Sequence, residues 1–535
     1  MAVRYENHYN VRATKQTDPI PGKDMVKNSA GGYSFEVDEW TKLERFLILG
    51  TEGGSYYASE HKMTKNSAEN VVNCIKKDGM RVVNTVVEIS DKGRAPKNDP
   101  ALFVLAMCAG MGDTETKQYA LANLQKVARI GTHLFNFMEY VKAFRGRGRA
   151  LRTAVANWYQ TKDVENLAYQ VVKYQQRDGW SHRDILRLVK PKPQDAVHDL
   201  IYGWIAKGTL KRKGRKDMPK ILDGHIKAQK AKSAKDVVKI IGEYGITRES
   251  VPTEYLKDPK VMEALLYAGK HGMPITALIR NLGNMSKCGL IKPMSSASKY
   301  VIEKLTNVEV LKRGRVHPLG LLVALNIYNQ GCGYRGSGTW TVDQDIVDAL
   351  DEAFYLAFDA VTPANKRFVL GLDVSSSMTW NEISGMPGIT PRIGSAAMAM
   401  VTLKTERQCA TMAFTTSFKK IDLSRKKRLD DVVNAVSDLD FGGTDCSLPM
   451  KWAMKNKVEA DAFVVYTDSQ SWAGDIHAVQ ALQQYRDKMG IPAKMIVVGM
   501  EGNNFSIADP NDAGMLDVVG FNTTAPAVMA DFVRE

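Results

Sequence analysis

Residues 368–377 read Phe-Val-Leu-Gly-Leu-Asp-Val-Ser-Ser-Ser, and this stretch decides the fold of the last third of the 535-residue chain. Five apolar or small residues in a row are typical of a strand that is buried on both faces of a parallel sheet. Asp373 and three serines follow at once. The stretch therefore predicts a buried strand with a polar loop at its carboxyl end.

Three more apolar runs of strand length follow, and helical patterns separate them. The runs lie at 409–414, 462–466 and 495–498, and helix-like spacing of apolar residues occurs around 393–405, 429–438, 447–456 and 476–489. Strands that alternate with helices build a doubly wound parallel sheet. We therefore expect residues 361–535 to form one α/β domain of Rossmann-like topology.

Hydroxyl and carboxylate side chains follow the expected strands, and ligands of open α/β sheets bind at these carboxyl ends. Asp373, Ser375 and Ser377 follow the first strand, Thr444 lies in a glycine loop, and Asp468 follows the third apolar run. Oxygen ligands without nitrogen or sulfur suit a hard cation, so we expect these five residues to hold Mg²⁺ or Mn²⁺. In the alternative interpretation the serines only cap the next helix.

Residues 17–360 have a different pattern. Apolar residues recur at spacings of three and four, as in the segment 164–172, and strand-like alternation is rare. So long a run of helices exceeds a simple bundle and suits stacked helical hairpins of the HEAT type, although no strict sequence period is present. We therefore expect an α-helical, HEAT-like repeat domain over 17–360.

The positive charge of the chain is concentrated in this helical part. The formal net charge is +14, but residues 361–535 hold 18 Lys and Arg against 20 Asp and Glu, which leaves 55 against 39 for residues 1–360. A basic excess of this size predicts a polyanionic partner whose phosphates are bound with release of counterions.

Two groups of basic residues are candidate RNA contacts. They comprise Arg147, Arg149 and Arg152, preceded by Arg145, and Lys173, Arg177, His182 and Arg183. Trp180 or Tyr174 could stack on an unpaired base, and a neutral His182 could bond a base or a 2′-hydroxyl. Core packing of Trp180 and a solvated helix face for each arginine are the alternatives. A further basic run from Lys211 to Lys235 is most simply a solvated loop and helix.

Several classes of protein are not indicated. The sequence has no phosphate-binding G-x-x-x-x-G-K-[ST] loop, no G-x-S-x-G turn and no H-E-x-x-H helix, so we expect no catalysis. The six cysteines lack any C-x-x-C pair and are expected to be free. No stretch approaches the ~20 apolar residues of a membrane span, and the start lacks the apolar core of a signal peptide, so we expect a cytoplasmic protein.

The order Asp-x-Ser-x-Ser, then Thr444, then Asp468 resembles the metal-ion-dependent adhesion site of von Willebrand A domains. That resemblance implies that Ser375, Ser377 and Thr444 touch the ion and that Asp373 and Asp468 act partly through water. It also implies an open coordination position that a partner's carboxylate completes.

From about residue 17 onward the chain resembles the Ro autoantigen family of TROVE-module RNA-binding proteins, in a bacterial version. The motifs that carry this resemblance are Glu52-Gly53-Gly54-Ser55-Tyr56-Tyr57, Gly148-Arg149-Ala150-Leu151-Arg152, Lys173-Tyr174 with Gly179-Trp180-Ser181-His182, Thr276-Ala277-Leu278-Ile279-Arg280-Asn281-Leu282-Gly283, and Gly442-Gly443-Thr444-Asp445-Cys446-Ser447-Leu448-Pro449. The resemblance implies a closed ring of HEAT-like repeats, with the von Willebrand A domain at its seam, that works as a monomer.

The same resemblance implies the partners. Members of the family bind small noncoding Y RNAs on a basic outer surface, where they place the Trp-Ser-His loop that here contains His182. They take single-stranded 3′ ends of misfolded RNAs into the central hole, in RNA quality control or degradation. Bacterial members are associated with 3′-to-5′ exoribonucleases, notably polynucleotide phosphorylase, and the Y RNA is the tether.

Two other functions stay open from the residues alone. The first is a protein-adhesion scaffold in which the metal site binds an acidic partner and the basic domain is incidental. The second is a metal-dependent nuclease, which needs clustered carboxylates for two ions. Hydroxyl groups dominate the expected site, which favours neither a nuclease nor any other two-metal chemistry.

Overall fold

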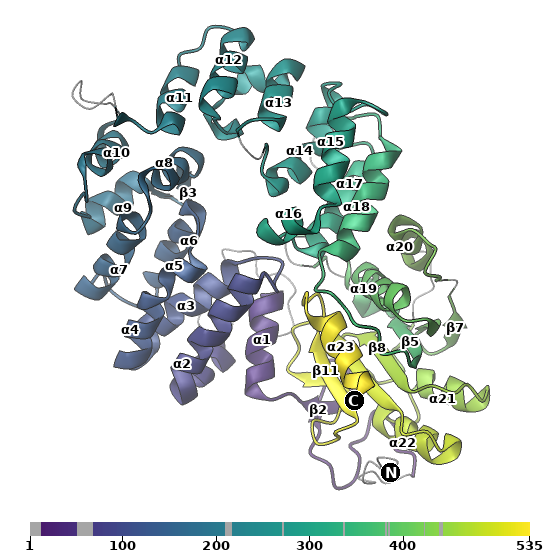
Figure 1. Cartoon of the computed structure of the whole chain (residues 1–535). Coiled ribbons are helices and arrows are strands. Elements are labelled where there is room, and N and C mark those ends of the chain that lie inside the picture. The colour runs from purple at the N-terminus through teal and green to yellow at the C-terminus, as the bar shows by residue number, and fades with distance from the viewer. Residues whose placement is uncertain are drawn as a thin grey trace.

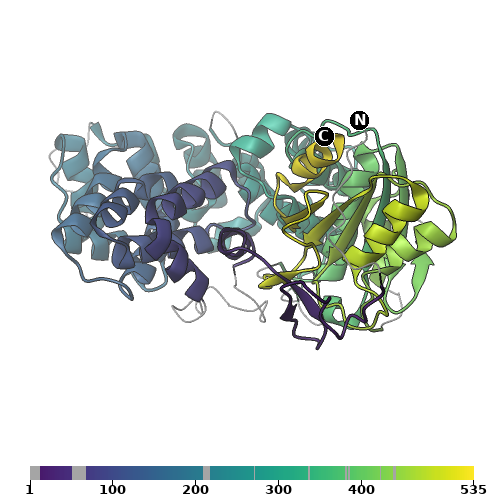
Figure 2. The ribbon, with the colours of Figure 1, turned by 90° about the horizontal axis from the view of Figure 1, so that it is seen from below.

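A ring of helices closed by one α/β domain makes up the molecule (Figure 1). The computed structural model describes residues 12–50, 68–208, 217–269, 272–334, 338–379, 382–383, 386–421, 423–437 and 442–535. The motif at 52–57 and the basic residues 211–216 lie outside the described residues. Seen from below, the ring is flat, with the helices on the left and the α/β domain on the right (Figure 2).

Eighteen helices form the described part of the ring. They are α1 (Glu39–Leu49), α2 (Glu69–Lys92), α3 (Asp99–Met111), α4 (Thr114–Ala122), α5 (Leu124–Val127), α6 (Gly131–Val141), α7 (Arg149–Gln160), α8 (Val164–Lys173), α9 (His182–Val189), α10 (Ala196–Lys207), α11 (Lys220–Ala228), α12 (Ala234–Tyr244), α13 (Pro259–Leu266), α14 (Ile275–Lys287), α15 (Ser296–Leu305), α16 (Val308–Arg313), α17 (Pro318–Asn329) and α18 (Gln344–Leu356). Two short 3₁₀ helices, η4 (Arg248–Ser250) and η5 (Thr253–Lys257), precede α13.

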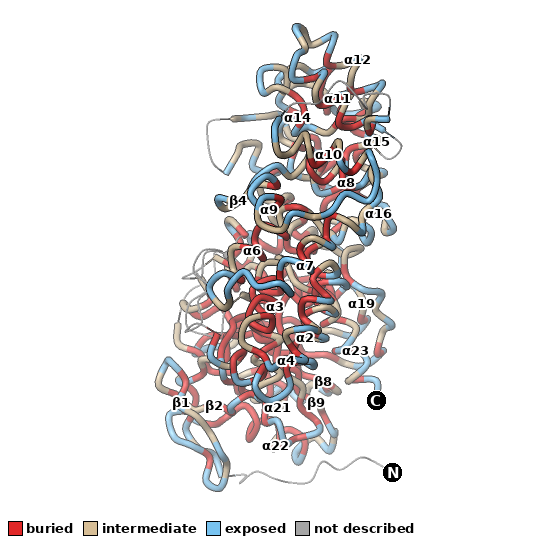
Figure 3. The backbone as a smooth tube through the Cα atoms, turned by 90° about the vertical axis from the view of Figure 1, so that its left-hand side faces the viewer, coloured by how far each residue is buried: buried red, intermediate tan, exposed pale blue. Residues whose placement is uncertain are grey.

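The helices form where the sequence places an apolar stripe behind a capping residue. Asp163 accepts a hydrogen bond from the backbone of Asn166 at the start of α8, and the stripe of α8 is buried at Leu167, Ala168, Val171 and Val172. Buried segments lie between the helices, and exposed segments lie on the outside of the molecule (Figure 3). The expectation of a helical N-terminal domain is confirmed.

Contacts between distant segments close the ring. Arg315, just before α17, makes an ion pair of 2.9 Å with Asp91 at the end of α2, which joins the two ends of the helical arc. Arg94 donates to the side chain of Asn522, and His317 bonds the backbone carbonyl of Phe521, so both ends also contact the α/β domain. The helical arc and the α/β domain therefore share one seam.

The α/β domain is built on a six-stranded sheet. Its strands are β5 (Arg367–Asp373), β6 (Gln408–Phe414), β7 (Phe418–Lys420), β8 (Ala462–Thr467), β9 (Lys494–Gly499) and β11 (Met515–Val519), in the order β11-β9-β8-β5-β6-β7. All neighbours are parallel except β6 and β7. The chain leaves β5 toward β6 and leaves β8 toward β9, so the order reverses between these two central strands.

Helices cover both faces of this sheet, as the sequence predicts. They are α19 (Pro391–Thr405), α20 (Leu429–Ser437), α21 (Leu448–Lys455), α22 (Ala478–Met489) and α23 (Ala525–Arg534), with the 3₁₀ turn η6 (Ser376–Thr379) after β5. Leu370 and Leu372 of β5 point into a core that is continuous with the helical ring, and Val369 points into the other core, beneath α21 and α22. The four predicted strands and four predicted helices are confirmed, while β7, β11 and α23 had not been predicted.

Residues 12–37, which we call the N-terminal strap, correct the expected start of the helical domain at residue 17. The strap packs on the α/β domain: β1 (Val26–Lys27) pairs with β2 (Tyr33–Glu36), and β2 pairs with β10 (Phe505–Ser506). The first helix begins only at Glu39. A strand of four residues that pairs with a segment more than 400 residues away carries too little local pattern to be read from the sequence.

Candidate metal centre and nucleic-acid interface

Asp373 and Asp468 flank the point at which the strand order reverses. Asp373 is the last residue of β5, and Asp468 follows the last residue of β8 directly. Because β5 and β8 are adjacent and parallel, their carboxyl ends meet at one edge of the sheet, where open α/β sheets bind their ligands. The topology therefore brings the two carboxylates together.

Hydrogen bonds hold the first group of site residues in place. One carboxylate oxygen of Asp373 accepts from the backbone N–H of Ser375 at 2.9 Å, and the other accepts from the hydroxyl of Thr467 at 2.6 Å. The hydroxyls of Ser375 and Ser377 lie 3.2 Å apart. Asp373, Ser375 and Ser377 thus form one compact cluster of oxygens, and the first of them is fully buried.

Thr444 reaches the site on a second loop. Its backbone carbonyl accepts from the backbone N–H groups of Trp472 and Ala473, at 3.0 and 3.1 Å, which ties the glycine loop to the segment after Asp468. Gly443 is necessary here, because a Cβ at that position would lie 2.8 Å from the indole of Trp472. The loop of Thr444 and the loop of Asp468 are therefore fixed to one another.

Gln16 of the N-terminal strap holds both loops. Its side-chain amide donates to a carboxylate oxygen of Asp445 and to the carbonyl of Ile476, each at 2.8 Å, and its oxygen accepts from the hydroxyl of Ser471. Gln16 is 1% exposed. The role of Gln16 could not be predicted from the sequence, because no local signal links it to residues so far along the chain.

The carboxyl groups of the site repel one another in a buried environment. Burial, followed by the charge of Asp468, raises the pKa of Asp373 to about 7, and burial also raises the pKa of Asp468. Glu501, which follows β9, is a third member: burial and the charge of Asp468 raise its pKa to about 9. Glu501 could have been predicted from the sequence, because it follows the expected strand at 495–498 and ligands of such sheets bind after the strands.

These residues fit a divalent cation. The oxygen Oδ2 of Asp468 is buried without a hydrogen-bond partner among the described residues, so a positive ion would satisfy it. No group of three or more His, Cys, Asp or Glu in the described ranges is arranged to hold a metal. The donor set therefore depends on hydroxyl groups, which suits Mg²⁺ or Mn²⁺ rather than zinc.

A tight hairpin brings together residues of the two basic groups. Strands β3 (Gln176–Arg177) and β4 (Trp180–Ser181) pair through a turn in which Asp178 and Gly179 have positive φ angles of 51° and 77°. Arg177 lies opposite Trp180, and the guanidinium of Arg147 lies 5.8 Å from the centre of the Trp180 ring. The guanidinium of Arg147 therefore lies near the Trp180 indole, whose N–H donates to Glu139 at 3.0 Å. The guanidinium of Arg177 lies 3.6 Å from the carboxylate of Asp178.

The remaining basic candidates are spread around this hairpin. Arg149 and Arg152 are exposed on α7, and Arg183 is exposed in the first turn of α9. Lys173 is not brought to the hairpin face: its ammonium group donates to the hydroxyl of Tyr169 at 2.7 Å, and it lines a separate cavity of about 280 Å³. The hairpin itself lies on the same side of the molecule as β1 and β2 of the strap (Figure 3).

His182 is placed differently from the prediction of a direct RNA contact. It is 3% exposed, and its imidazole bonds the buried hydroxyl of Tyr159 at 2.8 Å and packs against Phe135. Burial lowers its pKa to about 4, so the ring is neutral at pH 7. In this structure His182 lies beneath the hairpin as a packing residue. The sequence does not predict this burial, because His182 is a polar residue that directly follows the helix-capping Ser181.

Comparisons with known proteins cover the whole architecture. A family model for the TROVE domain matches residues 26–244 and 243–327, and one for the Ro60 vWA domain matches residues 367–533. A Deinococcus radiodurans protein named RNA-binding protein RO60 is 41% identical over 514 residues, which cover 95% of each chain. A protein of the same name from Caenorhabditis elegans is 34% identical over 599 residues, 98% of this chain and 92% of that one.

A solved structure agrees with the fold. The crystal structure of the Deinococcus radiodurans RO (RSR) protein superposes with a TM-score of 0.71 at 41% identity, covering 93% of this chain and 99% of that one.

The chain contains no helix, within the residues described, that is long and apolar enough to cross a membrane. All six cysteines are free.

Proposed function

This chain belongs to the Ro60 family of TROVE-domain proteins, and we propose that it binds RNA without catalysing a reaction on it. The observation that carries the proposal is the match to an RNA-binding protein along 95% of the chain, through the helical and the α/β parts alike. We assign it a small noncoding Y RNA, held in the cytoplasm on a basic surface of the ring, and single-stranded 3′ ends of misfolded RNA in the central opening.

The hairpin around Trp180 is the best candidate for the basic surface. The guanidinium of Arg147 lies near the Trp180 indole, and Arg177 is the partner of Trp180 across the hairpin. A phosphate at the arginines and an unpaired base at the ring would therefore be bound by neighbouring groups. Arg149, Arg152 and Arg183 add positive charge along α7 and α9. His182 supports the hairpin from below, and its contribution to RNA binding is indirect.

The candidate metal site is the second functional surface. Ser375, Ser377 and Thr444 would touch a bound Mg²⁺ or Mn²⁺, with Asp373 and Asp468 contributing charge. The ion would supply a position for the carboxylate of a protein partner. Trp472, which packs on the loop of Thr444 and is 43% exposed, adds an apolar contact next to that position. Apart from the metal site, we propose that the protein works as a monomer to which the Y RNA tethers an exoribonuclease such as polynucleotide phosphorylase.

A gel-shift titration tests the proposal. The purified protein is titrated against a stem-loop RNA with a single-stranded 3′ tail, at two salt concentrations, with Arg147→Glu and His182→Ser as variants. We expect tight binding of intact RNA that weakens steeply with salt and in both variants. Absence of binding at low salt would favour the adhesion scaffold, and shortened RNA in the presence of magnesium would favour a nuclease.

A further inference from the structure

A groove lies between α14 and α17 on the helical ring, next to the seam. Its volume is about 550 Å³, within the range of pockets that enclose small ligands. Ile279 of α14 and Val323, Ala324 and Ile327 of α17 form apolar walls, and Gly320 leaves the groove open, because a Cβ there would have nothing within 4 Å. The absence of a side chain at Gly320 of α17 therefore helps to form the groove.

One family motif of the sequence analysis lines this groove and has no role in the proposed RNA surface. The motif at 276–283 forms the first two turns of α14, and its residues Thr276, Ile279, Arg280 and Gly283, which share one helix face, all line the groove. Leu278 of the motif faces the other way and is buried in the core, and the buried Leu282 lies at the edge of the groove, which it also lines. The motif thus combines a packing face with a groove face.

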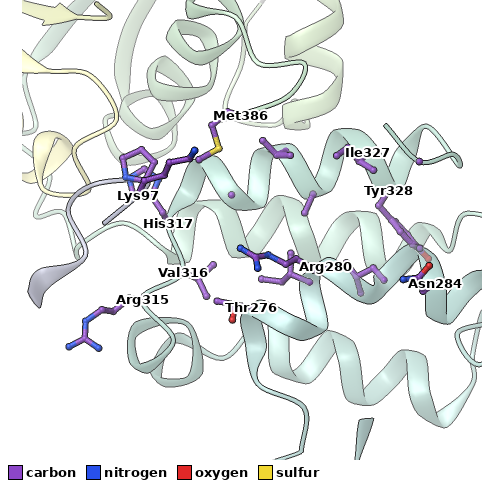
Figure 4. Close-up of a pocket in the computed structure, with 18 of the residues that line it drawn as sticks. Lys97, Thr276, Arg280, Asn284, Arg315, Val316, His317, Ile327, Tyr328 and Met386 are labelled. Carbon is purple, nitrogen blue, oxygen red and sulfur yellow. The ribbon is translucent and has the colours of Figure 1, made fainter. Parts of the chain in front are cut away.

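The charge of the groove is of one sign. Arg280 projects into the space between the two helices, with Lys97 at one end and Asn284 near Tyr328 at the other (Figure 4). Arg315 adds a third cation near the end occupied by Lys97, although Asp91 partly neutralises it. No Asp or Glu is among the described residues that line the groove. Apolar walls with cations and without carboxylates complement a flat, uncharged ring that carries an anionic group.

We propose that this groove binds one unpaired nucleotide, with the base between the apolar walls of α14 and α17 and a phosphate at Arg280 and Lys97. The inference rests on the proposed RNA binding and adds a distinct site to it. The nucleotide could be the end of an RNA strand or a free mononucleotide, because both present the same base and phosphate. The hydroxyl of Thr276 and the amide of Asn284, which also donates to Asn281 at 3.3 Å, line the groove and could bond the sugar or the edge of the base.

The position of the groove couples its occupancy to the seam. Pro96 and Lys97 come from the connection between α2 and α3, and Met386 comes from the α/β domain. A ligand in the groove therefore contacts both ends of the helical arc and the domain that closes it. Since a ligand that binds only the closed ring stabilises it, nucleotide binding should also raise the temperature at which the seam opens.

The test uses a variant that fills the groove without disturbing the helix. Gly320→Leu places a side chain in open space and improves helix propensity, and Gly203→Leu, at a helical glycine that likewise has nothing within 4 Å, is the matched control. Arg280→Ala removes the central cation, and Arg407→Ala, at an exposed arginine of the α/β domain, controls for the loss of charge. The probes are AMP and a 5′-labelled, unstructured RNA with a free 3′ end, measured by calorimetry and fluorescence anisotropy.

We expect Gly320→Leu, which fills the groove, and Arg280→Ala, which removes one charge-assisted contact, each to weaken binding of one or both probes about tenfold, while both controls bind as the wild type does. Weakened AMP binding identifies a free nucleotide as ligand, and an effect on the labelled RNA alone identifies a strand end. Unchanged affinities for both probes in both groove variants would overturn the assignment and leave a helical peptide as the better occupant. A wild-type protein that binds AMP but no stem-loop RNA would refute the proposed function and not the groove.

Discussion

The candidate metal site and the hairpin around Trp180 differ in how firmly their residues are fixed. At the metal site, buried carboxylates and hydroxyls are held by hydrogen bonds from three separate segments of the chain. At the hairpin, Arg147 and Arg177 are exposed, and the guanidinium of Arg147 lies near one indole ring. A small ion needs a preorganised site, whereas phosphate groups can be bound by exposed side chains that adjust their conformation.

The sharpest test of this difference is removal of the most buried carboxylate. Asp373→Ala should abolish the thermal stabilisation by Mg²⁺ or Mn²⁺, with a loss of metal affinity of at least ~100-fold, since even outer contacts of metal sites contribute up to that factor. RNA affinity should stay unchanged. Thermal unfolding with and without the ion, together with RNA titration, measures both.

Asp475→Ala is the control, because that carboxylate is exposed and pairs only with Lys451 among the contacts described. A loss of RNA binding in Asp373→Ala would show that the two regions are one functional unit.

The second test concerns the support beneath the hairpin. The pKa of His182 is about 4 in the folded protein against 6.5 in the unfolded chain, so its contribution to stability is complete above pH 6.5 and is lost as the pH falls toward 4. The loss amounts to about 3 kcal/mol for the helical ring. His182→Gln should remove this part of the pH dependence, as measured by urea unfolding followed by circular dichroism.

His317, whose pKa is also lowered to about 4 by burial, stays in that variant and keeps its own share of the pH dependence. An unaltered pH profile in His182→Gln would mean that the imidazole of His182 is hydrated and contributes nothing to the pH dependence of stability.

The third test separates the strap from the rest of the metal site. Gln16→Ala leaves Asp445 and Ser471 without their common partner, which should destabilise the α/β domain by about 2 kcal/mol. It should also weaken metal binding, because Ser471 bonds the carbonyl of Thr444. Calorimetric titration with Mn²⁺ measures the affinity.

Gln330→Ala, at an exposed position after α17, serves as the control. Metal affinity equal to that of the wild type would show that the strap stabilises the domain without shaping the ion site.

The smallest effect is expected for RNA affinity when an exposed arginine of the hairpin is changed. Arg147→Glu should weaken binding of a stem-loop RNA about tenfold at low salt and reduce the dependence of affinity on salt, because phosphate contacts are lost. Lys488→Glu, on the exposed side of α22, controls for the change in net charge. Equal RNA affinities of the two variants would move the basic surface away from the hairpin.

The sequence predicted what depends on chain order and missed what depends on distant contacts. Asp373 and Asp468 could be placed together because each follows a strand, and parallel strands end at the same edge. The burial of His182 and the role of Gln16 could not be predicted, since each depends on partners from other elements, Tyr159 and Asp445. The pairing of β2 in the strap with β10 also depends on such a distant partner. The motif at 276–283 was recognisable, but its groove exists only once α14 lies beside α17.

The pairing of β2 with β10 has a consequence for the synthesis of the protein. Strand β2 leaves the ribosome early, and its partner at Phe505–Ser506 is made 469 residues after Glu36. At roughly 5–20 residues per second, the strap waits for between about 20 and 100 seconds with its strand edge unpaired. During that interval Phe35, buried in the finished molecule, has no cover from the α/β domain. We therefore expect a nascent chain of this protein to bind chaperones that recognise apolar strands.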